Sequence, residues 1–354
     1  MSGKRIHPFV IAALWLLQGC LIDATDDRTG LPRAIAVQGP VGFHERFELV
    51  DTLVLESQDS VPVVRISGVS WQDDGTILIA DVSEANVKRY SKDGRLRHVI
   101  GRRGRGPGEF LEPRYPVING HHEIVVGEAN GQLSYFDSTG MFVDRRLPLS
   151  GLGISSLSIR PTGNTVVTGW PTEAGVLAEY DSIGLELRRM IPMKRPPVGD
   201  SPGNPLWLSM SQYWQVLVQD TAFVFATLSD SVWIVDLSTG SIASHQLLID
   251  GYLPPVLPER PLSPRDKEFA TWRGSFHTAM GAVSATDGFV GISLVQGVLN
   301  YGDPALFVYR APSGEWTALS AGPPVIAARP GEVLAIHRPE SETVVLARYR
   351  MLAQ

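Results

Sequence analysis

The sequence predicts an all-β fold, a six-bladed β-propeller whose last blade is closed by a strand from near the N-terminus. Turns containing glycine recur along the chain, and each lies between two short apolar runs with β-sheet propensity. The turns follow one another at spacings of 46, 44, 56 and 74 residues, and propeller blades repeat on a scale of about 40–50 residues. The turn glycines are Gly94, Gly140, Gly184, Gly240 and Gly314.

The first complete blade is the clearest. Residues 63–71 suit an innermost strand, and the three runs that follow it at 76–81, 87–90 and 96–100 suit the remaining strands. Asp74-Gly75 separates the first two runs, and Asp93-Gly94 separates the last two. Tight hairpins require positive φ, which glycine adopts without a steric penalty, so these pairs predict hairpin turns.

Four further blades follow with the same strand order. The second is expected over residues 115–147, the third over 156–191, the fourth over 213–249 and the fifth over 277–320.

The last blade has only three strands of its own, at 325–329, 332–337 and 343–350. Three strands would leave an open edge, which promotes aggregation. Residues 46–55 alternate well between apolar and polar side chains. We therefore predict that residues near 46–56 form the outer strand of the sixth blade.

Two insertions interrupt the repeat, at 192–208 and 251–274. Within the second, residues 263–272 predict a short helix, with Ser263 as its cap and Pro264 in its first turn. Both insertions join an outer strand to the next inner strand, and such connections emerge on one face of a propeller. Long loops gathered on one face predict the ligand-binding face.

The N-terminus has the features of a signal peptide. Lys4 and Arg5 precede the apolar run 9–17, which is too short to span a bilayer. Cys20 is the only cysteine, so no disulfide can form within the chain. The alternatives are lipidation at Cys20 and a generic signal peptide with an incidental cysteine.

The motif Leu17-Gln18-Gly19-Cys20 resembles the lipobox of bacterial lipoproteins. The resemblance implies cleavage before Cys20 and a lipid anchor on it, and Leu21 in place of aspartate implies sorting to the outer membrane. We expect a signal peptide over 1–20, a flexible tether over 21–44 and the propeller over 45–354.

The region 63–113 resembles the NHL-type repeats of six-bladed propellers. The matching pieces are 77–81, 86–90, the Asp93-Gly94 turn, and the linker 104–110 followed by Pro113. The resemblance is to bacterial six-bladed propeller lipoproteins, most of which have no assigned activity.

The composition and net charge of the chain indicate which classes of partner to expect. Apolar residues make up 44% and charged residues 19% of the chain, as in ordinary globular proteins. The net charge is −6, and no basic stripe alternates with aromatic residues, so nucleic acid is not an expected partner.

Arginines surround the glycine-rich linker and could hold an anion on the ligand face. The simpler interpretation is that they are solvated or pair with Asp81 and Glu84. The candidates are Arg102, Arg103, Arg105 and Arg114.

Carboxylates that converge from several blades hold calcium in propeller hydrolases, so acidic residues near the ligand face were considered as ligands. Asp81, Glu128 and Asp230 are the weak candidates. At each of these positions a solvated loop is the simpler interpretation. No cofactor is expected.

Two tryptophans, Trp207 in the first insertion and Trp272 in the second, could line a ligand site. The leading functional expectation is a non-catalytic binding or scaffolding module for a protein, peptide or glycan. The alternatives are a metal-assisted hydrolase or lyase, and a purely structural envelope component.

Overall fold

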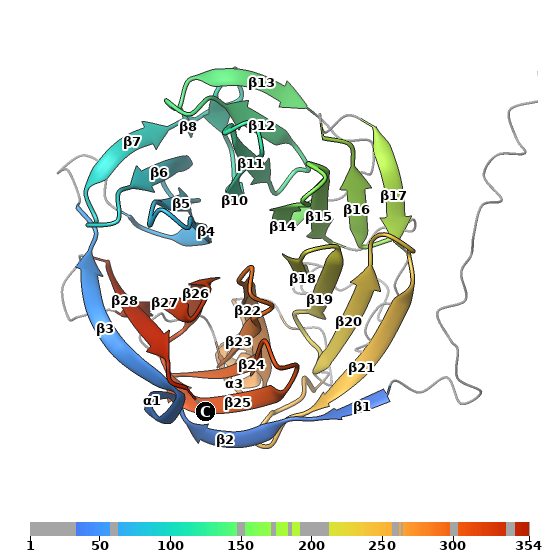
Figure 1. The fold of residues 1–354 in the computed structure, drawn as a ribbon. Coiled ribbons are helices and arrows are strands. Elements are labelled where there is room, and N and C mark those ends of the chain that lie inside the picture. Colours follow the sequence, from blue (N-terminus) through green and yellow to red (C-terminus); the bar gives the residue numbers. More distant parts are fainter. Residues whose placement is uncertain are drawn as a thin grey trace, which may run out of the picture.

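The computed structural model describes residues 33–56, 63–146, 153–170, 175–182, 186–191, 212–256, 262, 265–297, 304–337 and 344–353. In this part of the chain, six sheets stand around a common axis, as Figure 1 shows. The predicted six-bladed β-propeller is confirmed.

Each blade contains four antiparallel strands in chain order from the axis outward, the sixth taking its outer strand from the N-terminal region. Blade 1 is β4 (Ile66–Trp71), β5 (Ile77–Asp81), β6 (Asn86–Tyr90) and β7 (Leu96–Ile100). Blade 2 is β10 (Pro113–Ile118), β11 (Ile124–Glu128), β12 (Leu133–Phe136) and β13 (Phe142–Arg146). Blade 3 is β14 (Ile154–Ile159), β15 (Thr165–Gly169), β16 (Leu177–Tyr180) and β17 (Leu187–Ile191).

The remaining blades follow the same order. Blade 4 is β18 (Tyr213–Val218), β19 (Thr221–Ala226), β20 (Ser231–Asp236) and β21 (Ile242–Leu248). Blade 5 is β22 (His277–Ser284), β23 (Val290–Gln296), β24 (Ala305–Arg310) and β25 (Trp316–Gly322). Blade 6 is β26 (Val325–Arg329), β27 (Glu332–His337), β28 (Val345–Met351) and β3 (Phe47–Val54). A two-stranded pair, β8 (Arg102–Arg103) and β9 (Glu109–Phe110), lies in the linker between blades 1 and 2.

The N-terminal strand closes the ring as predicted. Strand β3 pairs antiparallel with β28 along its whole length, from Phe47 opposite Met351 to Val54 opposite Val345. The Arg348 guanidinium lies 2.6 Å from the Asp51 carboxylate across this pair. The last blade therefore joins segments from the two ends of the chain.

The chain before β3 is more ordered than the sequence predicts. Strand β1 (Arg33–Ala36) pairs parallel with β21, and β2 (Gln38–Gly42) pairs parallel with β25. A four-residue helix, α1 (Phe43–Arg46), then leads into β3. We call Arg33–Val54 the N-terminal belt, because it follows the perimeter of blades 4, 5 and 6 in Figure 1.

The belt corrects the predicted tether over 21–44. Residues 33–42 bond to the outer edges of two blades, so the part attached to the propeller begins at Arg33. Outer strands present unpaired backbone groups, and pairing with the belt satisfies them on blades 4 and 5. Residues 1–32, including Cys20, lie outside the described residues.

The turn glycines behave as the repeat requires. Gly94 has φ of +81° and Gly240 has φ of +82°, in the left-handed region that favours glycine. Gly140 and Gly314 have similar values, whereas Gly184 lies outside the described residues. The recurring turns thus mark strand connections, which is why their spacing predicts the blades.

The hydrophobic core lies between neighbouring blades and includes an aromatic cluster at the ring closure. Phe43 and Phe47 stack at 5.0 Å between ring centroids, and Tyr349 meets Phe43 edge-on at 5.0 Å. Phe47 also contacts Phe307 and Tyr309 of blade 5. The belt is therefore part of the core and does more than cover edges.

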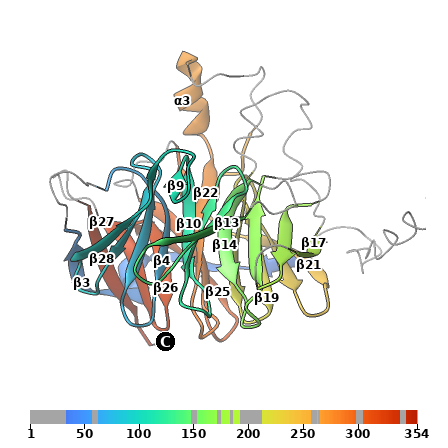
Figure 2. The ribbon, with the colours of Figure 1, turned by 90° about the horizontal axis from the view of Figure 1, so that it is seen from above.

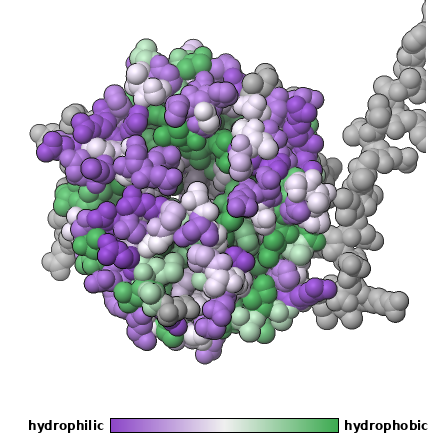
Figure 3. Space-filling view, in the orientation of Figure 1, coloured by the Kyte–Doolittle hydropathy of each residue, from purple (hydrophilic) through white to green (hydrophobic). Residues whose placement is uncertain are grey.

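One helix stands away from the ring. Helix α3 (Lys267–Arg273) rises above one face of blade 5 in Figure 2. A helix thus forms in the second insertion as expected, but its N-cap position is Asp266 and not the predicted Ser263. Figure 3 shows the opposite face, where hydrophobic residues gather near the axis over blades 1 and 2. The two faces therefore differ, because only one of them carries α3.

Candidate functional site

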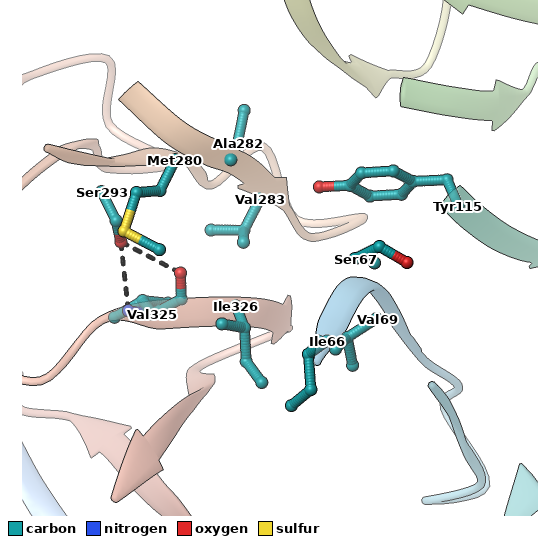
Figure 4. A pocket seen from close by; sticks show the side chains of 12 residues that line it. Ile66, Ser67, Val69, Tyr115, Met280, Ala282, Val283, Ser293, Val325 and Ile326 are labelled. Atoms are coloured by element: carbon teal, nitrogen blue, oxygen red, sulfur yellow. Dashed lines mark hydrogen bonds between the residues drawn. The ribbon is translucent and has the colours of Figure 1, made fainter. Parts of the chain in front are cut away.

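The inner strands enclose an axial pocket with an empty volume of about 480 Å³. Blades 1, 2, 5 and 6 contribute its walls, as Figure 4 shows. None of the twelve lining residues is charged, and most are apolar or small. They are Ile66, Ser67, Gly68, Val69, Tyr115, Met280, Gly281, Ala282, Val283, Ser293, Val325 and Ile326.

Tyr115 extends across the axis from blade 2. Its hydroxyl would lie 3.3 Å from a Cβ placed on Gly281 of blade 5, and its ring centroid lies 6.0 Å from that of Trp214 in blade 4. Burial raises the pKa of the Tyr115 hydroxyl well above its ordinary value. The side chain is therefore a neutral aromatic wall for the pocket.

The two serine hydroxyls of the lining join neighbouring blades. Ser67 donates to the carbonyl of Pro113 in blade 2 at 2.6 Å, and Ser293 lies 3.0 Å from the carbonyl of Val325 in blade 6. Neither hydroxyl hydrogen-bonds to a histidine or a carboxylate, as an activated nucleophile would. Both hydroxyl groups therefore form hydrogen bonds that connect neighbouring blades of the ring.

Asp81 has a structural role. Its buried carboxylate accepts hydrogen bonds from four backbone N–H groups, with the shortest, from Val64, at 2.7 Å. It also accepts from the Lys88 ammonium at 2.9 Å, and Lys88 in turn donates to the Asn86 side chain at 2.9 Å. These contacts fix the entry into blade 1 and use the oxygens that a metal would need.

The other acidic candidates lie apart from Asp81. Glu128 is buried in blade 2 and accepts from the Leu111 N–H at 3.0 Å, while burial raises the pKa of its carboxyl group. Asp230 in blade 4 accepts from the Gln246 side chain at 3.0 Å. Across the residues that the structure describes, no three histidines, cysteines or acids come together as metal ligands.

The glycine-rich linker supplies its own anion. The Glu109 carboxylate accepts from the Gly106 N–H at 2.8 Å and from Arg102 at 2.9 Å. The first of these bonds and then the second lower the pKa of the Glu109 carboxyl group. Arg103 donates to the carbonyl of Ser83 at 2.6 Å, and the Arg105 side chain is exposed.

Of the two simpler alternatives for these arginines, exposure to solvent holds for Arg105, whereas no ion pair among the described residues joins a linker arginine to Asp81 or Glu84. Lys88 already neutralises Asp81 inside the blade, so Arg102 pairs with Glu109 of its own linker. The linker amide and arginine thus both bind Glu109. Lys88 could not be recognised in the sequence, because a single alternating strand looks half-exposed.

Arg114 is separated from the linker arginines and precedes Tyr115. It pairs with Glu112 at 3.2 Å, and its guanidinium lies 5.9 Å from the Trp170 ring. Burial lowers the pKa of Arg114, and the Glu112 charge opposes that effect. Of the four candidate arginines, this one adjoins the axial pocket.

The second insertion is held by Trp272. Its indole N–H donates to the carbonyl of Val256 at 2.8 Å, and its ring contacts Phe269 and Phe276 at 5.7 and 5.1 Å between centroids. Trp272 therefore fastens α3 to the propeller. Trp207 lies outside the described residues.

Comparison with known proteins identifies the fold. Residues 35–156 match a family model described as a 6-bladed β-propeller. That region spans the belt and the first two blades. No curated protein matches the sequence.

Solved structures share the same architecture at low identity. A Bacteroides fragilis protein that is named as exported has a TM-score of 0.62 and 14% identity, and the comparison covers 91% of this chain and all of that one. A member of the DUF4221 family from Bacteroides vulgatus has a TM-score of 0.61 and 10% identity, with 87% and 99% covered. A virginiamycin B lyase from Staphylococcus aureus has a TM-score of 0.46 and 11% identity, with 86% and 100% covered. The likenesses to the two Bacteroides proteins show the fold alone.

Within the described ranges, no helix has the length and apolar character needed to cross a bilayer.

Proposed function

We propose that this protein is a non-catalytic binding module that holds a protein, peptide or glycan ligand on its α3-bearing face and at the axial pocket. The uncharged lining of the pocket is the observation that carries the proposal. An enzyme that uses a metal or an acid-base pair requires charged groups that converge on one point. Here four blades meet in a small apolar space instead, and such spaces bind ligands.

The test compares binding with chemistry. Full-length protein in nanodiscs would be applied to peptide and glycan arrays, beside the variant Ile326→Phe, which fills the pocket. We expect some array ligands to bind the natural protein and to bind Ile326→Phe more weakly. Both proteins should have the same thermal unfolding temperature, so that the weaker binding is not caused by misfolding.

A metal-assisted hydrolase or lyase is the alternative outcome of the same experiment. It would show tight calcium binding together with turnover of a lactone or ester, and those results would overturn the binding proposal. Asp81, Glu128 and Asp230 would then need to move together from three separate blades.

We further propose that the protein is an NHL-type lipoprotein, exported and anchored through Cys20 to the bacterial outer membrane. The lipobox resemblance supports the anchor, and the Bacteroides fragilis protein named as exported supports the compartment. Residues 21–32 remain as the tether, and twelve residues extend at most about 40 Å.

Metabolic labelling with a radioactive fatty acid tests the anchor. We expect the natural protein to incorporate label and to sediment with outer membranes, and Cys20→Ala to do neither. Equal labelling of the two proteins would exclude lipidation at this cysteine.

A further inference from the structure

Arg273 is a half-buried cation with no counter-charge among the residues that the structure describes. It ends α3, and its guanidinium donates to the Thr278 hydroxyl at 2.5 Å and lies 5.2 Å from the Phe276 ring centroid. Its Nη1 is buried and makes no hydrogen bond. No ion pair forms with Arg273 in the described part of the chain. Burial lowers the pKa of its guanidinium to about 10, so the group is still charged at neutral pH.

This absence distinguishes Arg273 from the other arginines near the inner strands. Arg114 pairs with Glu112, and Arg160 pairs with both Glu179 and Asp220. Burying a charge is costly unless an opposite charge or several hydrogen bonds compensate it. An anion from outside the chain would supply the missing compensation at Arg273.

The register of blade 5 connects this cation to strand residues that line the axial pocket. Thr278 is paired with Val295, and Val295 lies two residues beyond Ser293, so the three side chains share one face of the blade. Ser293 lines the pocket, and Met280 on the same strand as Thr278 does so too. Arg273 is thus joined through Thr278 to the face of blade 5 that carries Ser293 and Met280 of the pocket lining.

The axial pocket is apolar. Figure 4 shows Met280, Val283 and Ile326 around the space that Tyr115 bounds from the other side. A ligand that satisfies both regions has an anionic end and a compact apolar body.

We propose that Arg273 binds the carboxylate of a ligand whose apolar part enters the axial pocket. A planar guanidinium matches a carboxylate with two parallel hydrogen bonds, and these charge-assisted bonds are the strong ones. The same chemistry occurs in a free aliphatic or aromatic acid and in the C-terminal residue of a peptide. This inference rests on the proposed binding function and specifies its ligand.

The experiment uses matched acids and amides with the full-length protein in nanodiscs. The probes are 4-phenylbutyrate with 4-phenylbutanamide, and acetyl-Ala-Phe as the free acid with its C-terminal amide. Calorimetric titration should show each acid binding at least about tenfold more tightly than its amide. Tighter binding of the peptide acid than of 4-phenylbutyrate identifies a peptide end as the source, and the reverse identifies a free acid.

Arg273→Met keeps an unbranched apolar stem and removes the charge. We expect it to lower the affinity for each acid to that for the amide, with unchanged or improved thermal stability because an uncompensated buried charge is lost. Arg265→Met removes an equal charge from an exposed position just before α3, and we expect the affinity for each acid to change by less than about twofold.

Three results would overturn the inference. They are equal affinities for acids and amides, acid binding that survives Arg273→Met, and no binding of any probe at millimolar concentration. If acid binding survives Arg273→Met but is lost in Ile326→Phe, the proposed binding function stands without the carboxylate site. Failure of the proposed binding function itself would appear separately, as calcium-dependent turnover of a lactone or ester in the array experiment described above.

Discussion

Replacing Phe47 with alanine tests whether the N-terminal strand closes the ring by packing into the core. The Phe47 ring is fully buried against Phe43, Phe307 and Tyr309, so the change removes contacts with the belt and with blade 5. Truncating a buried phenylalanine costs about 3–5 kcal/mol. Unfolding entropy of about 2.1 cal/mol/K per residue, over 354 residues, converts this cost to a drop in Tm of about 4–7 °C.

Leu49 provides the control on the same strand, because its side chain is 49% exposed. We expect Leu49→Ala to change stability by less than about 0.5 kcal/mol. Thermal unfolding of the detergent-solubilised full chain, followed by circular dichroism, measures both variants. Equal shifts for Phe47→Ala and Leu49→Ala would refute the packing of β3 as the closing strand.

Three further outcomes are expected. Lys88→Met should destabilise the protein by about 3–5 kcal/mol, because it leaves the buried Asp81 charge unpaired. Urea unfolding measures this loss, and a smaller loss in a protein that already carries Asp81→Asn would establish that the two residues are coupled. Burial raises the pKa of the Glu128 carboxyl group above 4.5, so its ionisation lowers the free energy of unfolding as pH rises through the folded-state pKa, and has no such effect below about pH 4.5. Glu128→Gln should therefore stabilise the protein at pH 7 and have little effect at pH 4. Destabilisation by Glu128→Gln at pH 7 would contradict this. Deleting residues 33–42 should cause self-association in light scattering, because the edges of blades 4 and 5 are uncovered, whereas deleting residues 22–31 should not.

The ring could be predicted from the sequence because its signals are local. Hairpin glycines and alternating apolar residues recur at the blade spacing, and the missing strand of blade 6 leaves one alternating segment, 46–55, to supply it. Each of these observations depends only on nearby residues and on the need to pair every edge.

The belt strands could not be predicted in this way. Residues 33–42 include Gly39 and Pro40, which look like a linker. Their strand conformation depends on two blade edges more than 200 residues farther along the chain. Local propensity carries no information on such an edge, so tertiary contacts decide the conformation.

The candidate site was predicted only in part. The sequence identified Arg114 and the second insertion, but not Arg273, because a cation next to a helix end usually pairs with an acid or with solvent. Whether a counter-charge is present depends on which segments the fold brings together. Lys88 was missed for a related reason, since both faces of a middle strand in a blade are covered by neighbours.

The N-terminal belt has a consequence for how the molecule is made. Asp51 leaves the ribosome early, yet its partner Arg348 lies 297 residues later, so the pair cannot form until synthesis is almost complete. Contacts this distant in sequence slow folding. During that interval the growing chain carries unsealed sheet edges, which expose it to aggregation until its last strand arrives.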